Sequence, residues 1–293
     1  MKKKFSSIAG VTLIEILIGI IISVVMMAAM FTSYTVVNNS YSQVADRAKI
    51  STAGRDVIGM LLRDIRLAGF KYHNDNIPTS NEHAPIIITK SSNFAQACDK
   101  IEIVYGTIAG KPAGEFDKGN LKYEYERYKI TYECKRSKIP DKSAPPLPGN
   151  KYPPIDAFAI YKSKVKWNTT GKNWDDGDTD GNTKTYGPSL VTDYISDLVF
   201  NAIDDKGLLI KPPPTSTNAT KDKLYQIKTI DIALTVRSTK DFFRTSKARE
   251  IFAMTDSSRN IKKTDKFLRD TIVVTAHARN VGLWLRKMNK ALL

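Results

Sequence analysis

Residues 9–18 read AGVTLIEILI, and this stretch determines how the chain is organised. It opens an apolar run, from about Val11 to Val37, that is long enough to cross a bilayer as a helix. Residues 2–4, all lysine, come just before it. Because positive charge stays on the cytoplasmic side, everything after residue 37 should lie outside the inner membrane. The sequence therefore predicts one spanning helix followed by an extracytoplasmic region.

A single carboxylate, that of Glu15, lies inside the apolar run, and the next charged residue is Asp46. An unpaired charge within a membrane helix costs roughly 2.5–3.5 kcal/mol on insertion scales. Glu15 therefore needs a partner. A signal anchor or a secretory signal peptide would account for the apolar run but not for this carboxylate.

A glycine, an apolar residue and then Thr-Leu-Ile-Glu at the start of an apolar helix resemble the type IV prepilin signature. This resemblance implies a leader at residues 1–10, cleavage by a prepilin peptidase between Gly10 and Val11, and N-methylation of Val11. It also implies that Glu15 neutralises the new amine, in a neighbouring subunit, as the helix moves from lipid into a fibre. Val11 departs from the family pattern, in which phenylalanine is the usual first residue.

The helix is expected to continue beyond the membrane, from about residue 12 to 68. Apolar residues recur there at spacings of three and four, namely Ile50, Ala53, Val57, Leu61, Ile65 and Ala68. Charged residues fall mostly on other faces, namely Asp46, Arg47, Lys49, Arg55, Asp56, Arg63 and Asp64. Gly69 followed by Phe70 predicts the end of the helix, and Gly54 and Gly59 predict bends or close contacts.

From Phe70 onward the pattern changes to period two. Strands are predicted at residues 101–105, 121–134, 157–167, 230–237 and 272–279, with a bulge or turn near Arg127 where the aromatic phase slips. Breaker-rich loops are predicted at residues 140–154, 171–187 and 211–220. One long helix followed by many strands predicts an α+β, pilin-like fold with the helix packed on an antiparallel sheet. The expected divisions are a transmembrane helix at 11–37, an amphipathic continuation at 38–69 and a β-rich extracytoplasmic domain at 70–293.

Four shorter stretches resemble the PilW family of minor pilins. Residues 62–70 are similar to the end of its long helix, and residues 195–200, 230–237 and 275–280 are similar to its C-terminal half. The resemblance implies a minor pilin that primes type IV pilus assembly near the tip, for twitching motility, cell adhesion or DNA uptake. It implies major and minor pilins and a tip adhesin as partners. The protein would lie first in the inner membrane and then in the pilus fibre, or fimbrium, at the cell surface.

Two other functions stay open at this point. The first is a type II secretion pseudopilin equivalent to the J component, which needs the same processing and the same helix. The second is a signal-anchored extracytoplasmic receptor or enzyme. Catalytic patterns do not favour an enzyme, because His73, His83 and His277 are scattered and no H-x-x-x-H, C-x-x-C or G-x-S-x-G motif occurs.

Cys98 and Cys134 are the only cysteines. An even number in an oxidising compartment favours a disulfide between them, and the alternative is two unpaired thiols at strand ends.

Asp176, Asp178 and Asp180 alternate before a glycine, as in the first half of a calcium loop. The twelfth position is Gly187 instead of glutamate, so the full motif fails. Two interpretations of this stretch remain. One is a looser Ca²⁺ site completed by Asp175 or Asp193, and the other is a hydrated acidic loop. No cofactor is required.

The chain of 293 residues carries 45 Lys and Arg against 30 Asp and Glu, a net charge of +15. Residues 221–293 hold 17 of these basic residues and 7 acidic ones, interleaved with aromatic residues. This excess suits contact with DNA phosphates, or else a solvated face, an acidic neighbouring subunit or membrane headgroups.

Overall fold

The fold is that of a computed structural model, which describes residues 10–70, 84–91, 98–108, 125–142, 144–168, 171–175, 185–211, 226–251, 254 and 261–281. The chain divides into two compact units, Met1–Lys49 and Ile50–Leu293. The first contains the start of a long helix, and the second contains the rest of that helix and a sheet.

Helix α1 spans Leu13–Leu67, 55 residues, which confirms the helix predicted at 12–68. Gly69 takes the left-handed conformation, with φ of 71°, as expected for a residue that ends a helix. The N–H of Phe70 donates to the carbonyl of Leu67, and the side-chain amide of Asn280 donates to the carbonyl of Arg66 at 3.0 Å. The last carbonyls of α1 are therefore satisfied by the main chain and by a distant residue.

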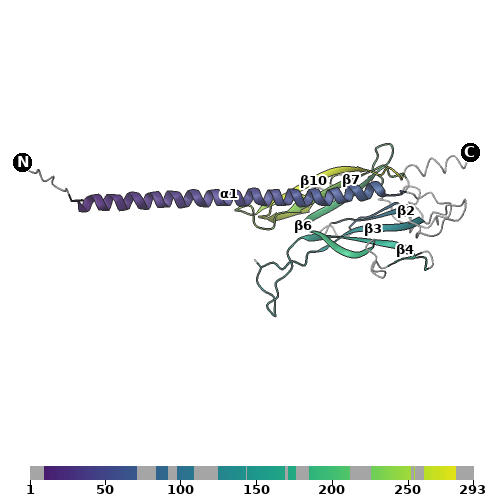
Figure 1. The fold of residues 1–293 in the computed structure, drawn as a ribbon, viewed down its shortest axis with the longest axis horizontal. Helices are drawn as coiled ribbons and strands as arrows, with labels where there is room; N and C mark the ends of the chain where they lie inside the picture. The colour runs from purple at the N-terminus through teal and green to yellow at the C-terminus, as the bar shows by residue number, and fades with distance from the viewer. Residues whose placement is uncertain are drawn as a thin grey trace, which may run out of the picture. The chain divides into compact units, whose positions relative to one another are not determined.

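The strands are β1 (Ile86–Thr89), β2 (Lys100–Ile108), β3 (Tyr125–Arg136), β4 (Phe158–Asn168), β5 (Asn173–Trp174), β6 (Tyr186–Ile203), β7 (Thr229–Arg237), β8 (Lys247–Ile251), β9 (Ile261–Asp265) and β10 (Arg269–His277). Seven form one antiparallel sheet in the order β1-β2-β3-β4-β6-β7-β10, with β5 paired to β4. β8 and β9 form a separate hairpin. Figure 1 shows α1 lying along β7 and β10. The α+β class, with one long helix on an antiparallel sheet, is confirmed.

The core forms where the second part of α1 meets the sheet. The apolar row predicted on α1 lies there, and Leu61 and Ile65 are fully buried. They share one cluster with inward-facing strand residues such as Ile101, Ile103 and Leu234. Burial of this apolar face is what fixes the helix to the sheet.

The bulge predicted near Arg127 is wrong. Arg127 pairs with Gly106 in an unbroken register along β2 and β3. Tyr128 and Tyr132 belong to one buried phase of β3. Of the two tyrosines that suggested the slip, Tyr125 begins β3 on the other phase, and Tyr123 lies outside the described residues.

The irregular strand is β6. Its register with β4 shifts on either side of Ile160, and Tyr194 has a positive φ of 62°. Residues of β6 up to Thr192 pair only with β4, while residues from Asp197 onward pair only with β7. The bulge at Tyr194 thus lets the first part of β6 pair with β4 and the second part pair with β7.

The sheet has two ends that matter for the sites below. The proximal end is the row of paired positions Arg136, Phe158, Ile195 and Val236. It lies at Gly54 of α1, because a β-carbon on Gly54 would lie 3.5 Å from Val236. The distal end is the row Ile203, Thr229 and His277. It precedes Asn280, which caps the last turn of α1.

Candidate processing and assembly site

The predicted cleavage pair lies immediately before the helix. Gly10 and Val11 are exposed and have no regular secondary structure, and α1 begins at Leu13. A β-carbon on Gly10 would meet nothing within 4 Å. The peptide bond between these residues therefore lies in an exposed stretch outside the helix.

Glu15 acts as a helix cap in this structure. The backbone N–H of Thr12 donates to Oε2 of Glu15 at 3.4 Å, and the N–H of Glu15 donates to the Thr12 carbonyl at 3.0 Å. Threonine followed three residues later by glutamate is the capping-box pattern, which satisfies donors left over at a helix start. Sequence reasoning missed this second role of Glu15, although the spacing Thr12-x-x-Glu15 signals it.

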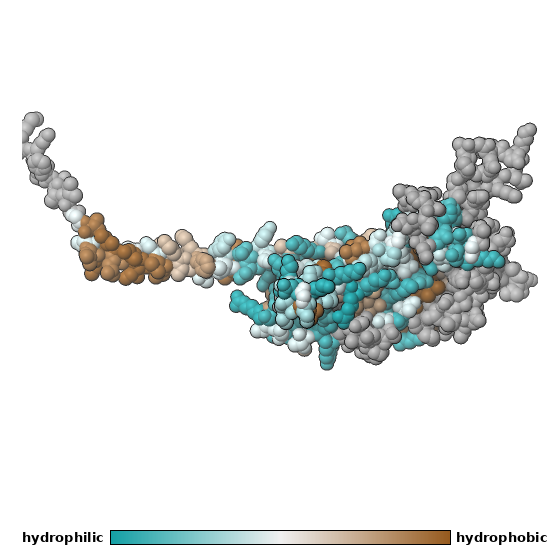
Figure 2. Space-filling model, turned by 90° about the horizontal axis from the view of Figure 1, so that it is seen from below, coloured by the Kyte–Doolittle hydropathy of each residue, from teal (hydrophilic) through white to brown (hydrophobic). Residues whose placement is uncertain are grey.

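The first part of α1 leaves its apolar side chains exposed. Leu13, Met27 and Phe31 are 83%, 69% and 69% exposed, and the same holds along the run from Val11 to Val37. Figure 2 shows this part of α1 as hydrophobic. By length and composition α1 can cross a membrane. A helix that is apolar all round must be covered by lipid or by other helices.

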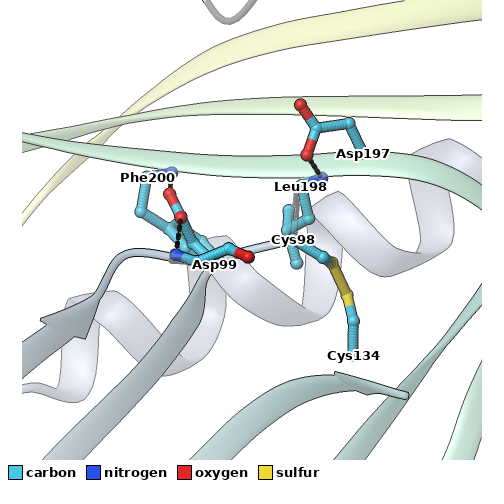
Figure 3. The surroundings of a disulfide bond; sticks show 7 residues. Cys98, Asp99, Cys134, Asp197, Leu198 and Phe200 are labelled. Atoms are coloured by element: carbon cyan, nitrogen blue, oxygen red, sulfur yellow. Dashed lines mark hydrogen bonds between the residues drawn. A yellow bond between two sulfur atoms is a disulfide. The ribbon is translucent and has the colours of Figure 1, made fainter. Parts of the chain in front are cut away.

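The two cysteines form the predicted pair. Cys98 and Cys134 are joined as a disulfide, with their Cα atoms 6.0 Å apart (Figure 3). The bond ties Cys98, two residues before β2, to β3. Next to it, the buried carboxylate of Asp99 accepts hydrogen bonds from the Phe200 N–H and from Lys90 Nζ, both at 2.9 Å. The start of β2 is thereby fixed to β6 as well, which the sequence did not indicate.

Asp64 is buried, although the sequence pattern groups it with the charged residues that fall mostly on faces of α1 other than the apolar row. Its Oδ2 accepts a hydrogen bond from the Tyr132 hydroxyl at 2.6 Å and lies 2.7 Å from Lys162 Nζ. Burial, and then the Asp64 charge, raises the pKa of Tyr132. This group joins α1 to β3 and β4 by polar contacts inside an otherwise apolar interface.

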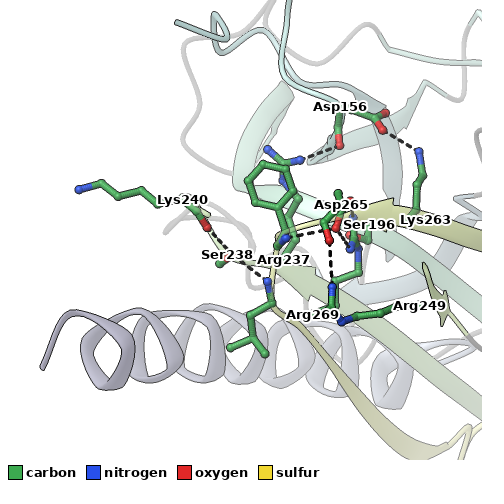
Figure 4. Close-up of polar contacts among 11 residues, drawn as sticks. Asp156, Ser196, Arg237, Ser238, Lys240, Arg249, Lys263, Asp265 and Arg269 are labelled. Atoms are coloured by element: carbon green, nitrogen blue, oxygen red, sulfur yellow. Dashed lines mark hydrogen bonds and ion pairs between the residues drawn. The ribbon is translucent and has the colours of Figure 1, made fainter. Parts of the chain in front are cut away.

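A second polar group lies at the proximal end of the sheet (Figure 4). Arg237 is buried, donates to the carbonyl of Asp156 at 3.1 Å and stacks over the Phe267 ring at 4.0 Å. Burial, followed by the nearby charge of Arg269, lowers the pKa of Arg237. Arg269 binds the Asp265 carboxylate through its two terminal guanidinium nitrogens, at 2.8 and 2.5 Å.

The acidic members of this group keep their charge. Burial alone would raise the pKa of Asp265, but the hydrogen bonds and charge of Arg269 outweigh it and hold that pKa below its ordinary value. Burial would also raise the pKa of Asp156, but Lys263, 2.7 Å away, outweighs burial and lowers that pKa. Both carboxylates are therefore ionised and engaged.

The calcium prediction lies outside the described residues, because it concerns Asp176, Asp178 and Asp180. Of the further ligands proposed, Asp175 accepts a hydrogen bond from the Asn168 amide, and Asp193 accepts one from the Tyr194 N–H. Within the described part of the chain, no group of three or more acidic, histidine or cysteine side chains could hold a metal ion.

No protein-family model matches the chain, and no curated protein matches its sequence. The structure is similar to that of a type IV-like pilin, TTHA1219, from Thermus thermophilus. The two share 10% sequence identity, with 79% of this chain and 96% of that chain covered and a TM-score of 0.43.

Proposed function

We propose that this chain is a pilin-type subunit that is cleaved between Gly10 and Val11 and assembles through α1. One observation carries the proposal: an exposed apolar helix begins three residues after an exposed glycine and contains one carboxylate in its first turn. Cleavage there would remove the basic leader and keep the entire apolar helix. The helix would then be free to exchange lipid for the helices of other subunits.

Glu15 would guide this exchange. In the described structure its carboxylate holds the Thr12 N–H, next to the future N-terminus. Once Val11 carries a free amine, the same carboxylate can bind it or the amine of a neighbouring subunit. A buried ion pair of this kind fixes register better than it adds stability, and register is what a growing fibre needs.

The finer assignment is a minor pilin of the PilW type that primes pilus assembly near the tip together with other minor pilins. The four short stretches that resemble this family support it, as does the size of the extracytoplasmic region at 70–293. In this assignment the protein waits in the inner membrane as a substrate of the prepilin peptidase. It then enters a fibre at the cell surface, where it contacts major pilins and a tip adhesin.

The mass of the native N-terminus tests the proposal. We expect a chain that starts at a methylated Val11, and Gly10→Val should leave the precursor uncut. Gly19→Val is the matched control, because Gly19 is also exposed and free of close neighbours but lies inside α1. A native chain that begins at Met1 would refute the proposal and favour a signal-anchored receptor or enzyme.

Deleting the gene separates a pilus role from the alternative in type II secretion. Loss of surface fibres with normal secretion supports the minor pilin. Loss of secretion with normal fibres supports the pseudopilin instead.

A further inference from the structure

A lysine, an aspartate and an asparagine from three parts of the chain meet next to the disulfide. Lys90 follows β1, Asp99 precedes β2, and Asn201 lies in β6 near the distal end of the sheet. Lys90 Nζ lies 2.9 Å from Asp99 Oδ2 and donates a hydrogen bond to Asn201 Oδ1 at 3.0 Å. Asp99 and Asn201 are buried, whereas the Lys90 side chain is 30% exposed. These three residues are called the lysine–asparagine site below.

The main chain of β6 holds the two charged members of this site. The second part of β6 pairs with β7, and Lys90 and Asp99 bind its other edge. The Phe200 N–H donates to Asp99 Oδ2 at 2.9 Å (Figure 3), and the Phe200 carbonyl accepts from Lys90 Nζ at 2.5 Å. The N–H of Asp99 also donates to the Leu198 carbonyl at 2.8 Å. The amine and the carboxylate are therefore held in place beside Asn201.

The side-chain amide of Asn201 has one unsatisfied atom. Its Oδ1 must face Lys90, because an ammonium group can donate hydrogen bonds but cannot accept them. This contact fixes the orientation of the amide. Nδ2 is then buried, and it has no hydrogen-bond partner within the part of the chain that the structure describes. Buried polar atoms are rarely left in this state, and a reactive role is one explanation.

We propose that Lys90 and Asn201 become joined by an isopeptide bond, with Asp99 as the catalytic base. Asp99 lies within the hydrogen-bond distance that a general base needs, and it takes one proton from the Lys90 ammonium. The lone pair freed on Nζ attacks Cγ of Asn201, and the electron pair of the carbonyl moves onto Oδ1. As that pair returns, the bond from Cγ to Nδ2 breaks.

The atoms of this reaction balance without a co-reactant. Nδ2 takes a second proton from Nζ and leaves as ammonia, which then takes the proton held by Asp99. The products are one secondary amide and one ammonium ion, and Asp99 is again a carboxylate. Because Nδ2 has no hydrogen bond to a described residue, no such contact holds it back as it leaves.

The isopeptide bond would restrain the fold more strongly than the disulfide does. It would close a loop with a sequence separation of 111 residues, compared with 36 for Cys98 and Cys134. A cross-link that closes a longer loop restrains the unfolded chain more on the chain-entropy estimate. The bond would join β1, at one edge of the sheet, to β6. The inference concerns only the second compact unit and does not depend on the proposed function.

Mass spectrometry of the purified full chain, with its disulfide reduced, tests the inference. We expect the mass to be lower than that of the sequence, counted from the N-terminus actually found, by one ammonia. Trypsin needs a free lysine side chain, so it should not cut after Lys90. The digest should instead contain one branched peptide that joins the segment with Lys90 to the segment with Asn201. This peptide is formed whether or not the leader has been removed.

Three single variants make the test specific. Lys90→Arg keeps the cation but should abolish both the loss of ammonia and the branched peptide. Asp99→Asn keeps the size of the side chain but removes the base, and it should leave most chains without the bond. Lys162→Arg is the matched control, because Lys162 is also a partly buried lysine paired with a carboxylate, that of Asp64. It should keep the bond. Circular dichroism shows whether each variant is folded.

Each outcome decides the matter. If the wild-type digest contains peptides cut after Lys90 and an unmodified Asn201, the site is an ion pair only and the inference is overturned. If Lys90→Arg still loses ammonia, the loss comes from another asparagine, which overturns the inference as well. A bond that forms equally in Asp99→Asn overturns the role given to Asp99. All of these results leave the proposed function intact, since cleavage after Gly10 is read from a different peptide.

Discussion

A β-carbon on Gly54 would lie 2.5 Å from Cδ1 of Ile272, so α1 and β10 approach as closely as a glycine allows. Gly59, five residues along the same helix, would meet nothing within 4 Å. The sequence predicted a bend or a close contact at both glycines. Only Gly54 makes a close contact.

Alanine at each position should separate these roles. Gly59→Ala should stabilise the protein by up to about 1 kcal/mol, the usual gain of alanine over glycine in a helix. For Gly54→Ala the same gain is offset because Ile272 must move, so the free energy of unfolding should change little. Gly54→Leu should destabilise by about 2 kcal/mol through overpacking. Urea unfolding of the three variants measures this, and equal gains at both alanine positions would contradict the close contact.

Removing Asp64 should be costly, because Lys162 and Tyr132 would lose a buried partner. We expect Asp64→Ala to lower the free energy of unfolding by about 3 kcal/mol. Adding Lys162→Met should restore part of that loss, since the unpaired ammonium is then gone. Urea unfolding of the two single variants and the double variant measures the coupling. Strict additivity would show that the pair does not interact.

Stability should fall at alkaline pH because of the buried tyrosines. Burial, with a contribution from Asp64, raises the pKa of Tyr105 from 10.0 to about 12. In that window the unfolded chain loses the proton and the native state keeps it, so stability is full below pH 10 and declines up to about pH 12. Each such tyrosine contributes a slope of at most about 1.4 kcal/mol per pH unit. Tyr105→Phe should make the decline shallower in thermal unfolding across this range, whereas an unchanged slope would count against the shift.

The disulfide closes a loop with a sequence separation of 36 residues. On the chain-entropy estimate its loss should cost about 4 kcal/mol. Cys98→Ser with Cys134→Ser should therefore unfold at much lower urea, and the wild type in reductant should behave in the same way. If reductant destabilises the double variant as much as the wild type, the effect does not come from this bond.

Glu15 caps the start of α1 and has a proposed charge role in assembly, and two substitutions distinguish them. Glu15→Gln keeps an acceptor for the Thr12 N–H but removes the charge, while Glu15→Ala removes both. Both should be cleaved after Gly10, and both should reduce assembled fibres about tenfold or more, because the amine of Val11 has lost its partner. Fibre counts by electron microscopy and immunoblots of processing measure this. Normal fibre numbers with Glu15→Gln would leave only the capping role.

Local periodicity predicted the elements that can pack against any apolar surface. The apolar row on α1 and the alternation in β7 are of this kind. β8 and β9 escaped prediction because their stretches KAREI and IKKTD are largely polar and pair outside the core. The loop predicted at residues 171–187 overlaps the first two residues of β6, because Gly187 reads as a breaker although the strand continues through it.

The site residues divide in the same way. Gly10, Val11 and Glu15 lie close enough in sequence for a motif to indicate them, and their roles stay a prediction. The spacing of Thr12 and Glu15 also indicated the cap that the structure shows. The burial of Asp64 was not predicted because its partners, Tyr132 and Lys162, are distant in sequence and reach it only through the sheet. Charge complementarity between remote residues leaves no local pattern to detect.

Under the proposed export, the disulfide between Cys98 and Cys134 would also report whether a chain has crossed the inner membrane. A chain still in the reducing cytoplasm would have two free thiols, whereas a translocated chain would have none. Thiol-specific labelling of whole-cell lysates would therefore count stalled precursors directly. Comparing that count with the fraction that retains the leader would show whether translocation or proteolysis comes first.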